Sequence, residues 1–166
     1  ANTATYSTAE SIKLTQEAEK LGVDACLLVV PYYNKPSQEG LYLHFRAVAE
    51  ATGLPCILYN VPSRTVANLS ADTMIRLSEI DNVVGVKEAS GSLEQIARII
   101  GGVKKKGFLL YSGNDSDTLP ILSLGGYGVI SVASHLVGNK LKLMITEYLA
   151  GHREGAARIH HELLPL

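Results

Sequence analysis

The stretch Asn82-Val-Val-Gly-Val-Lys-Glu-Ala-Ser-Gly91 places a lysine at the end of a short apolar run with the composition of a buried strand. A side chain in that place points into a packed interior, where burial is unfavourable for a charged ammonium group. Burial therefore favours the neutral amine of Lys87, a nucleophile that forms Schiff bases with carbonyl compounds. The alternative is that Lys87 reaches back to solvent from its strand end, as many lysines do.

The run before Lys87 is one of five short apolar runs, each continuous rather than alternating in polarity. Such runs are typical of strands covered on both faces, as in a parallel sheet. Stretches with helical periodicity lie between them, and the first begins at a capping box, Ser7-Thr-Ala-Glu10, and ends before Gly22. The strands are expected at residues 25–30, 56–59, 83–86, 108–111 and 129–132, and the later helices at about 41–53, 70–78, 93–100, 118–124, 140–150 and 153–164.

The strand–helix repeat fits two architectures, a doubly wound sheet and a (β/α)8 barrel. No GxGxxG motif follows a strand, and the glycines of Gly125-Gly-Tyr-Gly128 precede one, which indicates a tight turn. Polar and aromatic residues gather just after the strands, where a barrel carries its chemistry. A complete barrel has eight strands and roughly 250 residues. We therefore predict an α/β fold, a partial barrel of about five βα units over residues 1–138, followed by a C-terminal helical region over residues 139–166. The first five residues are expected to be the end of a loop.

Composition excludes several classes of function. The chain has 166 residues, of which 46% are hydrophobic, and its net charge is -1 without a basic stripe, which argues against nucleic acid and acidic membranes as partners. We expect neither a membrane span nor a signal peptide. Cys26 and Cys56 lie inside apolar runs and are expected to be buried free thiols, which favours a cytoplasmic protein. Asp115 and Asp117 share one loop, but no histidine completes a metal site, so turn or capping roles are expected.

Three further side chains at strand ends are candidates for chemistry. Tyr59 can shuttle a proton or hold a carboxylate, or it can be a tyrosine whose ring packs and whose hydroxyl reaches water. Arg64, in a loop stiffened by Pro62, can grip a carboxylate or be a solvated surface arginine. Tyr33 belongs to a tyrosine pair between prolines, which suits chemistry, a subunit contact or both.

Other ionisable residues are expected to lie away from this chemistry. Glu88 follows Lys87 directly, so its side chain points to the opposite face of the strand and meets helix groups outside the barrel wall. His44 is expected on a helix surface, and His160 and His161 are expected to be solvated on the last helix.

Four segments resemble the dihydrodipicolinate synthase family in order and spacing, and the similarity runs essentially from end to end. They are Tyr32-Tyr-Asn-Lys-Pro-Ser-Gln-Glu-Gly40, Tyr59-Asn-Val-Pro-Ser-Arg64, Gly85-Val-Lys-Glu-Ala-Ser-Gly91 and Gly126-Tyr-Gly-Val-Ile-Ser131. The wider superfamily includes N-acetylneuraminate lyase and 2-keto-3-deoxy sugar acid aldolases, which resemble the synthases at the lysine and the tyrosine. The run ending in Arg64 favours the synthase branch.

The resemblance implies a lyase that condenses pyruvate with L-aspartate 4-semialdehyde at the start of lysine (diaminopimelate) biosynthesis. Lys87 then matches the lysine that forms the imine with pyruvate, and Tyr59 matches the general acid and base. Arg64 matches the residue that recognises carboxylate, and Ile130 matches a position that binds pyruvate through its backbone. Tyr33 matches a relay tyrosine that reaches across a dimer interface. The resemblance also implies a homodimer or homotetramer, and neither a metal nor an organic cofactor.

Two departures from the family bear on activity and on the loop near Arg64. Nothing matches the family's Gly-Thr-Thr-Gly segment, which carries part of the proton relay, and Val66 stands where the family usually has glycine. We therefore expect weak or no activity from the isolated chain, and a different loop at Val66, because valine is strained at positive φ. Two alternatives stay open: a pyruvate-dependent lyase for a sugar acid, and a half-barrel without catalytic activity that associates through unpaired strand edges.

Overall fold

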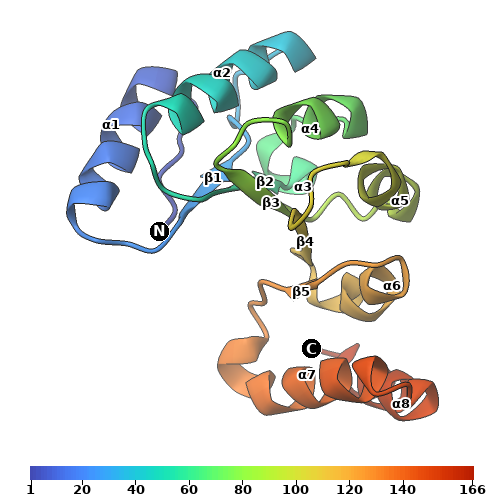
Figure 1. Cartoon of the computed structure of the whole chain (residues 1–166). Helices are drawn as coiled ribbons and strands as arrows, with labels where there is room; N and C mark the ends of the chain where they lie inside the picture. Colours follow the sequence, from blue (N-terminus) through green and yellow to red (C-terminus); the bar gives the residue numbers. More distant parts are fainter.

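The computed structural model describes residues 1–166 as one parallel sheet with helices packed along it (Figure 1). Each strand pairs with the next in the chain, so the sheet has the order β1-β2-β3-β4-β5. This is the predicted α/β fold with five βα units, and the sheet continues into the first residues rather than starting after a loop. Asn2 forms a parallel bridge with Leu27. The strands are β1 (Cys26–Val29), β2 (Cys56–Asn60), β3 (Val83–Glu88), β4 (Leu109–Ser112) and β5 (Gly128–Val129).

The helices agree with the predicted pattern, with three differences. A short helix, α3, and a 3-10 turn, η1, follow β2 and β4 where loops were expected. The penultimate helix begins at Ser134, ahead of the predicted residue 140, with a non-helical kink at Val137. The boundary predicted at residues 138/139 falls inside this helix, and the division into two regions stays a prediction. The elements are α1 (Thr8–Lys20), α2 (Gln38–Glu50), α3 (Pro62–Thr65), α4 (Ala71–Leu77), α5 (Leu93–Gly102), η1 (Asp115–Asp117), α6 (Thr118–Ser123), α7 (Ser134–Leu149) and α8 (Arg153–Leu163).

Serine caps and glycine turns set the helix ends. The hydroxyl of Ser7 accepts a hydrogen bond from the backbone N–H of Glu10, which confirms one half of the predicted capping box. The other half is not formed, because the N–H of Ser7 donates to the hydroxyl of Thr5 instead of to Glu10. Serines cap α2, α4 and α5 in the same way, which satisfies backbone donors that the first turn leaves free. The turn between α6 and β5 contains Gly125 at φ 100°, a conformation that suits glycine, so the tight turn predicted here is confirmed.

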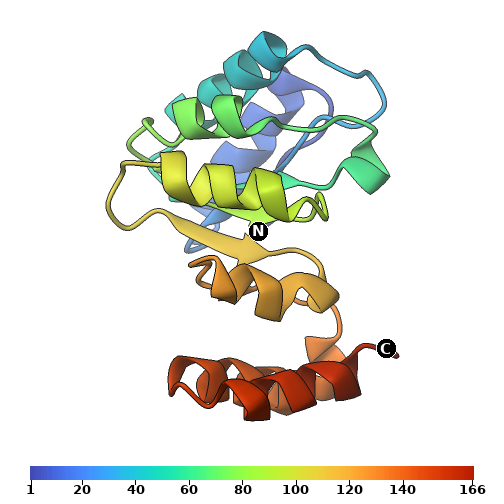
Figure 2. The same cartoon turned by 90° about the vertical axis from the view of Figure 1, so that its right-hand side faces the viewer.

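The main core lies between one face of the sheet and the helices α1, α2, α4, α5 and α6, which follow one another along it (Figures 1 and 2). Leu28, Leu58 and Val86 project to this side and are fully buried. Burying each such side chain contributes about 1.5–3 kcal/mol. On the opposite face, side chains such as Leu27 and Ile57 are only partly buried. The sheet therefore has one covered and one open face, as a section of barrel wall does.

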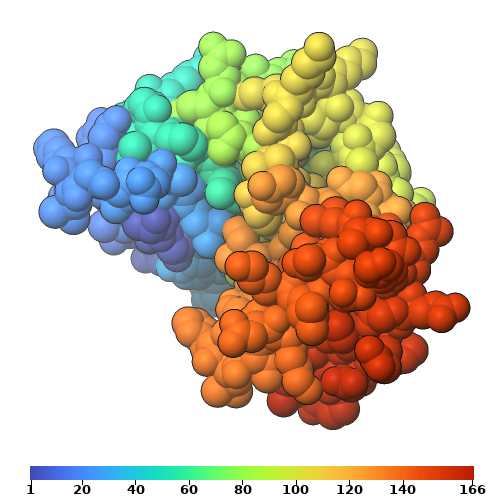
Figure 3. All heavy atoms as spheres, turned by 60° about the horizontal axis from the view of Figure 1, so that its bottom comes forward, coloured from blue at the N-terminus to red at the C-terminus, as the bar shows by residue number.

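The last two helices form a smaller unit beyond α6. Leu141 and Met144 of α7 pack against Ala156 and Ile159 of α8 in a second hydrophobic cluster. In the space-filling view, the orange and red residues of this unit project beside the blue and green part of the chain (Figure 3). None of the helices has both the length and the apolar character needed to cross a membrane.

Candidate active site

The register of the sheet brings three side chains together at the carboxyl ends of the central strands. Tyr59 of β2 pairs with Lys87 of β3, and Lys87 pairs with Tyr111 of β4. The amine nitrogen of Lys87 lies 4.3 Å from the centre of the Tyr59 ring. Lys87 is only 8% exposed, so its predicted burial is confirmed. The sheet thus holds a lysine amine against an aromatic ring at its rim.

The surroundings of Lys87 favour the neutral amine. Burial lowers the pKa of Lys87, and the negative charge of Asp115 opposes part of this effect. Burial also raises the pKa of Tyr59, while the positive charge of Arg64 acts in the opposite direction. A lysine with a lowered pKa beside a protonated phenol has the two groups that imine chemistry needs, a nucleophile and a proton donor.

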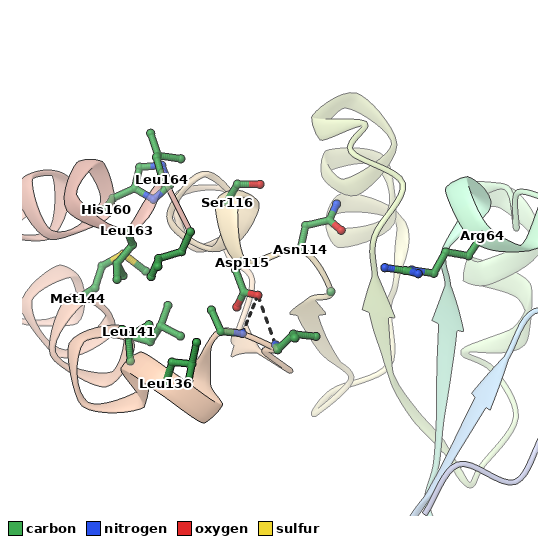
Figure 4. Close-up of a pocket in the computed structure, with 15 residues that line it drawn as sticks. Arg64, Asn114, Asp115, Ser116, Leu136, Leu141, Met144, His160, Leu163 and Leu164 are labelled. Atoms are coloured by element: carbon green, nitrogen blue, oxygen red, sulfur yellow. Dashed lines mark hydrogen bonds between the residues drawn. The ribbon is translucent and has the colours of Figure 1, made fainter.

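Arg64 lies on α3 rather than in the expected loop. The helix begins with Pro62, whose fixed φ suits a first helical position. Arg64 lines two cavities, one of about 580 Å³ beside Asn114 and Asp115 and one of about 360 Å³ that also includes Tyr59. In Figure 4 its guanidinium group points across the larger cavity toward Asn114 and Asp115. This is a suitable place for a group that recognises carboxylate.

Val66, directly after α3, has a left-handed backbone conformation. A different loop was expected here, because valine is strained at positive φ. Its φ is 59° and its ψ is 15°, and its N–H donates to the carbonyl of Pro62 at 2.9 Å. The backbone hydrogen bond that closes the short helix fixes this conformation, even though a β-branched residue is strained there. The residue that follows the helix carrying Arg64 therefore has a strained backbone conformation.

Gly113 is a site residue that the sequence analysis did not single out. A Cβ at this position would lie 2.8 Å from the Cβ of Ala89 and 3.2 Å from the Cε of Lys87. The backbone after β4 therefore runs directly along the lysine side chain, which only glycine permits. A glycine immediately after a strand that neighbours the lysine strand was the available signal.

The two remaining predicted site residues, Ile130 and Tyr33, lie in different surroundings. Ile130 follows β5 directly, and its N–H donates to the carbonyl of Ser112 at 3.0 Å. The carbonyl oxygen of Ile130 accepts no hydrogen bond within the chain, so it is available at the rim. Tyr33 is 89% exposed and has a strained φ of 75°. A single chain does not bring Tyr33 to Lys87, and its predicted relay role stays a prediction.

Glu88 points away from Lys87, toward the helices, as predicted. It is fully buried, and the side-chain amide of Asn60 donates to both of its carboxyl oxygens at 3.1 Å. The N–H of Ser90 donates to the same carboxyl group at 2.8 Å. Burial raises the pKa of Glu88, and these hydrogen bonds oppose the shift. Asn60 and Glu88 thus connect β2 and β3 behind Tyr59 and Lys87.

The remaining polar predictions have mixed outcomes. The carboxyl group of Asp115 accepts hydrogen bonds from the backbone N–H groups of Val132 and Ala133 in the turn before α7, which agrees with the turn role, one of the two roles expected. Cys26 and Cys56 are buried free thiols, as predicted. His44 is not on a surface: it is 6% exposed, because α1 covers it, and Thr8 contacts its Nδ1 at 2.9 Å. Burial lowers its pKa to about 4.

His160 is half-buried at the larger cavity, whereas His161 is exposed as predicted. Nowhere in residues 1–166 do three or more potential metal ligands of the His, Cys, Asp and Glu types come together.

Comparisons with known proteins agree with this geometry. The model of the dihydrodipicolinate synthetase family matches residues 1–166. The 4-hydroxy-tetrahydrodipicolinate synthase of Dehalococcoides mccartyi strain BAV1 is 64% identical over the whole chain, which covers 56% of that relative. The corresponding enzyme of Bacillus subtilis strain 168 is 56% identical over the whole chain, which covers 57% of it.

A solved structure shows the same arrangement. The dihydrodipicolinate synthase of Cyanidioschyzon merolae, crystallised with lysine bound, is 52% identical with a TM-score of 0.94, over 96% of this chain and 54% of that one. The likeness supports the partial barrel predicted from the sequence. The chain spans about half the length of the curated relatives it matches. Over that length, this chain belongs to the dihydrodipicolinate synthetase family.

Proposed function

We propose that this chain carries the Schiff-base centre for condensing pyruvate with L-aspartate 4-semialdehyde to 4-hydroxy-tetrahydrodipicolinate, a step of lysine biosynthesis. The observation that carries the proposal is the buried amine of Lys87 at 4.3 Å from the Tyr59 ring. The names of the relatives support this choice of substrates. The chain covers about half of them, so the complete activity needs structure that their remaining length provides.

The proposed chemistry begins at the amine. The neutral amine of Lys87 attacks the keto carbon of pyruvate, and loss of water gives an iminium ion. The iminium withdraws electrons, so a proton leaves the methyl carbon and an enamine forms. The enamine carbon attacks the aldehyde carbon, which makes the new C–C bond and regenerates an iminium. Attack by the amino group of the second substrate then displaces Lys87 and closes the ring. Tyr59 gives and takes protons in these steps, and its raised pKa means that it begins the cycle as the proton donor.

Other residues bind substrates in this proposal. Arg64 holds the carboxylate of aspartate semialdehyde at the cavity entrance, since a guanidinium group pairs with a carboxylate through two hydrogen bonds. The free carbonyl of Ile130 contacts bound pyruvate. Tyr33 enters the site of a second chain, which is consistent with its 89% exposure here. No metal or organic cofactor takes part, because the imine is the electron sink. A cytoplasmic homodimer or homotetramer is the proposed form of the complete protein.

Pyruvate and borohydride test the proposal directly. Reduction of the imine is expected to leave a pyruvate-derived group on the Lys87 peptide, found by mass spectrometry. Lys87→Ala is expected to abolish labelling, whereas Lys105→Ala keeps it, because Lys105 donates only to backbone carbonyls elsewhere. Absence of an adduct on folded wild-type chain would contradict the proposal.

Acceptor aldehydes distinguish the two enzyme alternatives. Turnover of aspartate semialdehyde supports the synthase, and preference for N-acetylmannosamine or glyceraldehyde supports a sugar-acid lyase. The half-barrel without activity is supported by one specific observation, the open face of the sheet. It predicts association in light scattering together with no pyruvate adduct.

A further inference from the structure

The carboxyl group of Asp115 ties two separate segments of the rim together. Asp115 lies at the start of η1, after β4. The hydroxyl of Ser131 donates to one of its oxygens. The other oxygen accepts from the N–H groups of Val132 at 3.3 Å and Ala133 at 3.1 Å. The hydroxyl of Ser131 also accepts from the N–H of Ser134 at 2.8 Å. One side chain thus fixes the whole turn between β5 and α7.

This carboxyl group also lies on the loop that runs along the lysine. Gly113, two residues earlier, is close enough that an added Cβ would meet the Cε of Lys87 at 3.2 Å. Asp115 lines the cavity of about 580 Å³ together with Arg64 (Figure 4). The loop that borders the lysine side chain therefore also carries the carboxyl group of Asp115, which lines the same cavity as Arg64.

The residues that pair with Lys87 on the two neighbouring strands carry no charge. The ionisable neighbours of Lys87 in the sheet are Tyr59 on β2 and Tyr111 on β4, and burial raises the pKa of both phenols, so they stay neutral. The charge of Arg64 acts on Tyr59, whereas Asp115 is the charge that acts on Lys87.

We propose that Asp115 is a positioning residue for the reaction at Lys87: it fixes the turn that follows Ile130 and keeps a negative charge on the loop that borders the lysine. The inference rests on the proposed function, because the charge matters most once Lys87 carries a cationic iminium. An opposite charge nearby stabilises that cation. The fixed turn also holds the carbonyl of Ile130 at the rim.

Competitive acylation across a range of pH tests the charge without any pyruvate. Limiting acetic anhydride, followed by peptide mass spectrometry, reports the titration of each lysine. In Asp115→Asn the midpoint for Lys87 is expected to shift to lower pH. Asp117→Asn is the matched control, because its carboxyl group bonds to Asn114 and Ser116 instead. Ser131→Ala removes the hydrogen bond from the Ser131 hydroxyl to Asp115 without changing any charge. This variant is expected to leave the titration midpoint of Lys87 unchanged.

Amide hydrogen exchange tests the tie. The N–H groups of Val132 and Ala133 are expected to exchange faster in Asp115→Ala than in the wild-type chain. Unchanged exchange, an unchanged Lys87 midpoint in Asp115→Asn, or an equal shift in Asp117→Asn would each overturn the inference. Failure of the proposed function is recognised separately, by the absence of a pyruvate adduct on wild-type Lys87 while the amine still titrates.

Discussion

Replacing Val66 by glycine is expected to stabilise the protein. Val66 is held at φ 59° directly after the helix that carries Arg64. A left-handed conformation costs a non-glycine residue about 1–3 kcal/mol, and a β-branched residue lies in the upper part of that range. Glycine removes this cost but loses about 0.5–1 kcal/mol through the greater freedom of the unfolded chain. The valine side chain is 63% exposed, so lost burial removes only about 0.5 kcal/mol more.

The net expectation is a gain of about 1 kcal/mol in the free energy of unfolding, or roughly 2–4 °C in Tm for a chain of this size. Thermal and urea unfolding followed by circular dichroism measure it. Val132→Gly is the control, because Val132 is 71% exposed but has an ordinary φ. That change is expected to destabilise the chain by about 0.5–1 kcal/mol. If Val66→Gly lowers stability as much as Val132→Gly does, the strain argument is wrong.

Three further predictions concern Gly113, Glu88 and His44. Gly113→Ala places a methyl group against Ala89 and Lys87, so we expect pyruvate labelling to fall and the free energy of unfolding to drop by about 1–3 kcal/mol. Gly101→Ala is the control, because the space around Gly101 in α5 is open, and it should stabilise the protein by about 0.5–1 kcal/mol. The raised pKa of Glu88 means that the folded state holds its proton to higher pH than the unfolded state. Stability from this group is therefore full below its unfolded pKa and is lost as pH rises through the folded pKa. The free energy of unfolding, measured at several pH values, should rise for Glu88→Gln relative to the wild-type chain as pH rises. A difference that stays constant with pH would contradict this. The pKa of His44 is lowered to about 4, so the unfolded state takes up a proton at higher pH than the folded state does. The free energy of unfolding should therefore fall as pH drops from about 6.5 toward 4, and His44→Gln should remove this part of the pH dependence.

Local chemistry in the sequence was enough to predict the strands and the position of Lys87. Continuous apolar runs indicated a sheet buried against helices, and a serine three residues before a helical N–H indicated the first cap. Both signals act over a few residues, so they survive in any tertiary context. The same holds for the opposite directions of Lys87 and Glu88, which follow from the alternation of side chains along a strand.

Features set by packing between distant segments were not available to that reasoning. His44 sits among residues of a helical pattern, and only the placement of α1 over α2 buries it. The sequence did not predict the first turn of α7, because Gly138 is a weak helix former and follows the kink at Val137. The hydrogen bonds between Asp115 and the turn after Ile130 join residues far apart in sequence, so spacing could predict a turn or capping role but not its partner.

The adjacency of Lys87 and Glu88 explains why the site needs a strand at this position. Their side chains project to opposite faces of the sheet. Lys87 therefore lies at the rim, while Glu88 accepts hydrogen bonds from Asn60 of the neighbouring strand. The same register pairs Tyr59 with Lys87, so the hydrogen bonds behind the sheet and the contact between tyrosine and lysine in front of it depend on one alignment of β2 and β3. A slip of one residue between β2 and β3 would exchange the faces and bury the tyrosine in the helix layer. The buried glutamate is therefore best understood as a register device for the two groups that we propose carry out the chemistry.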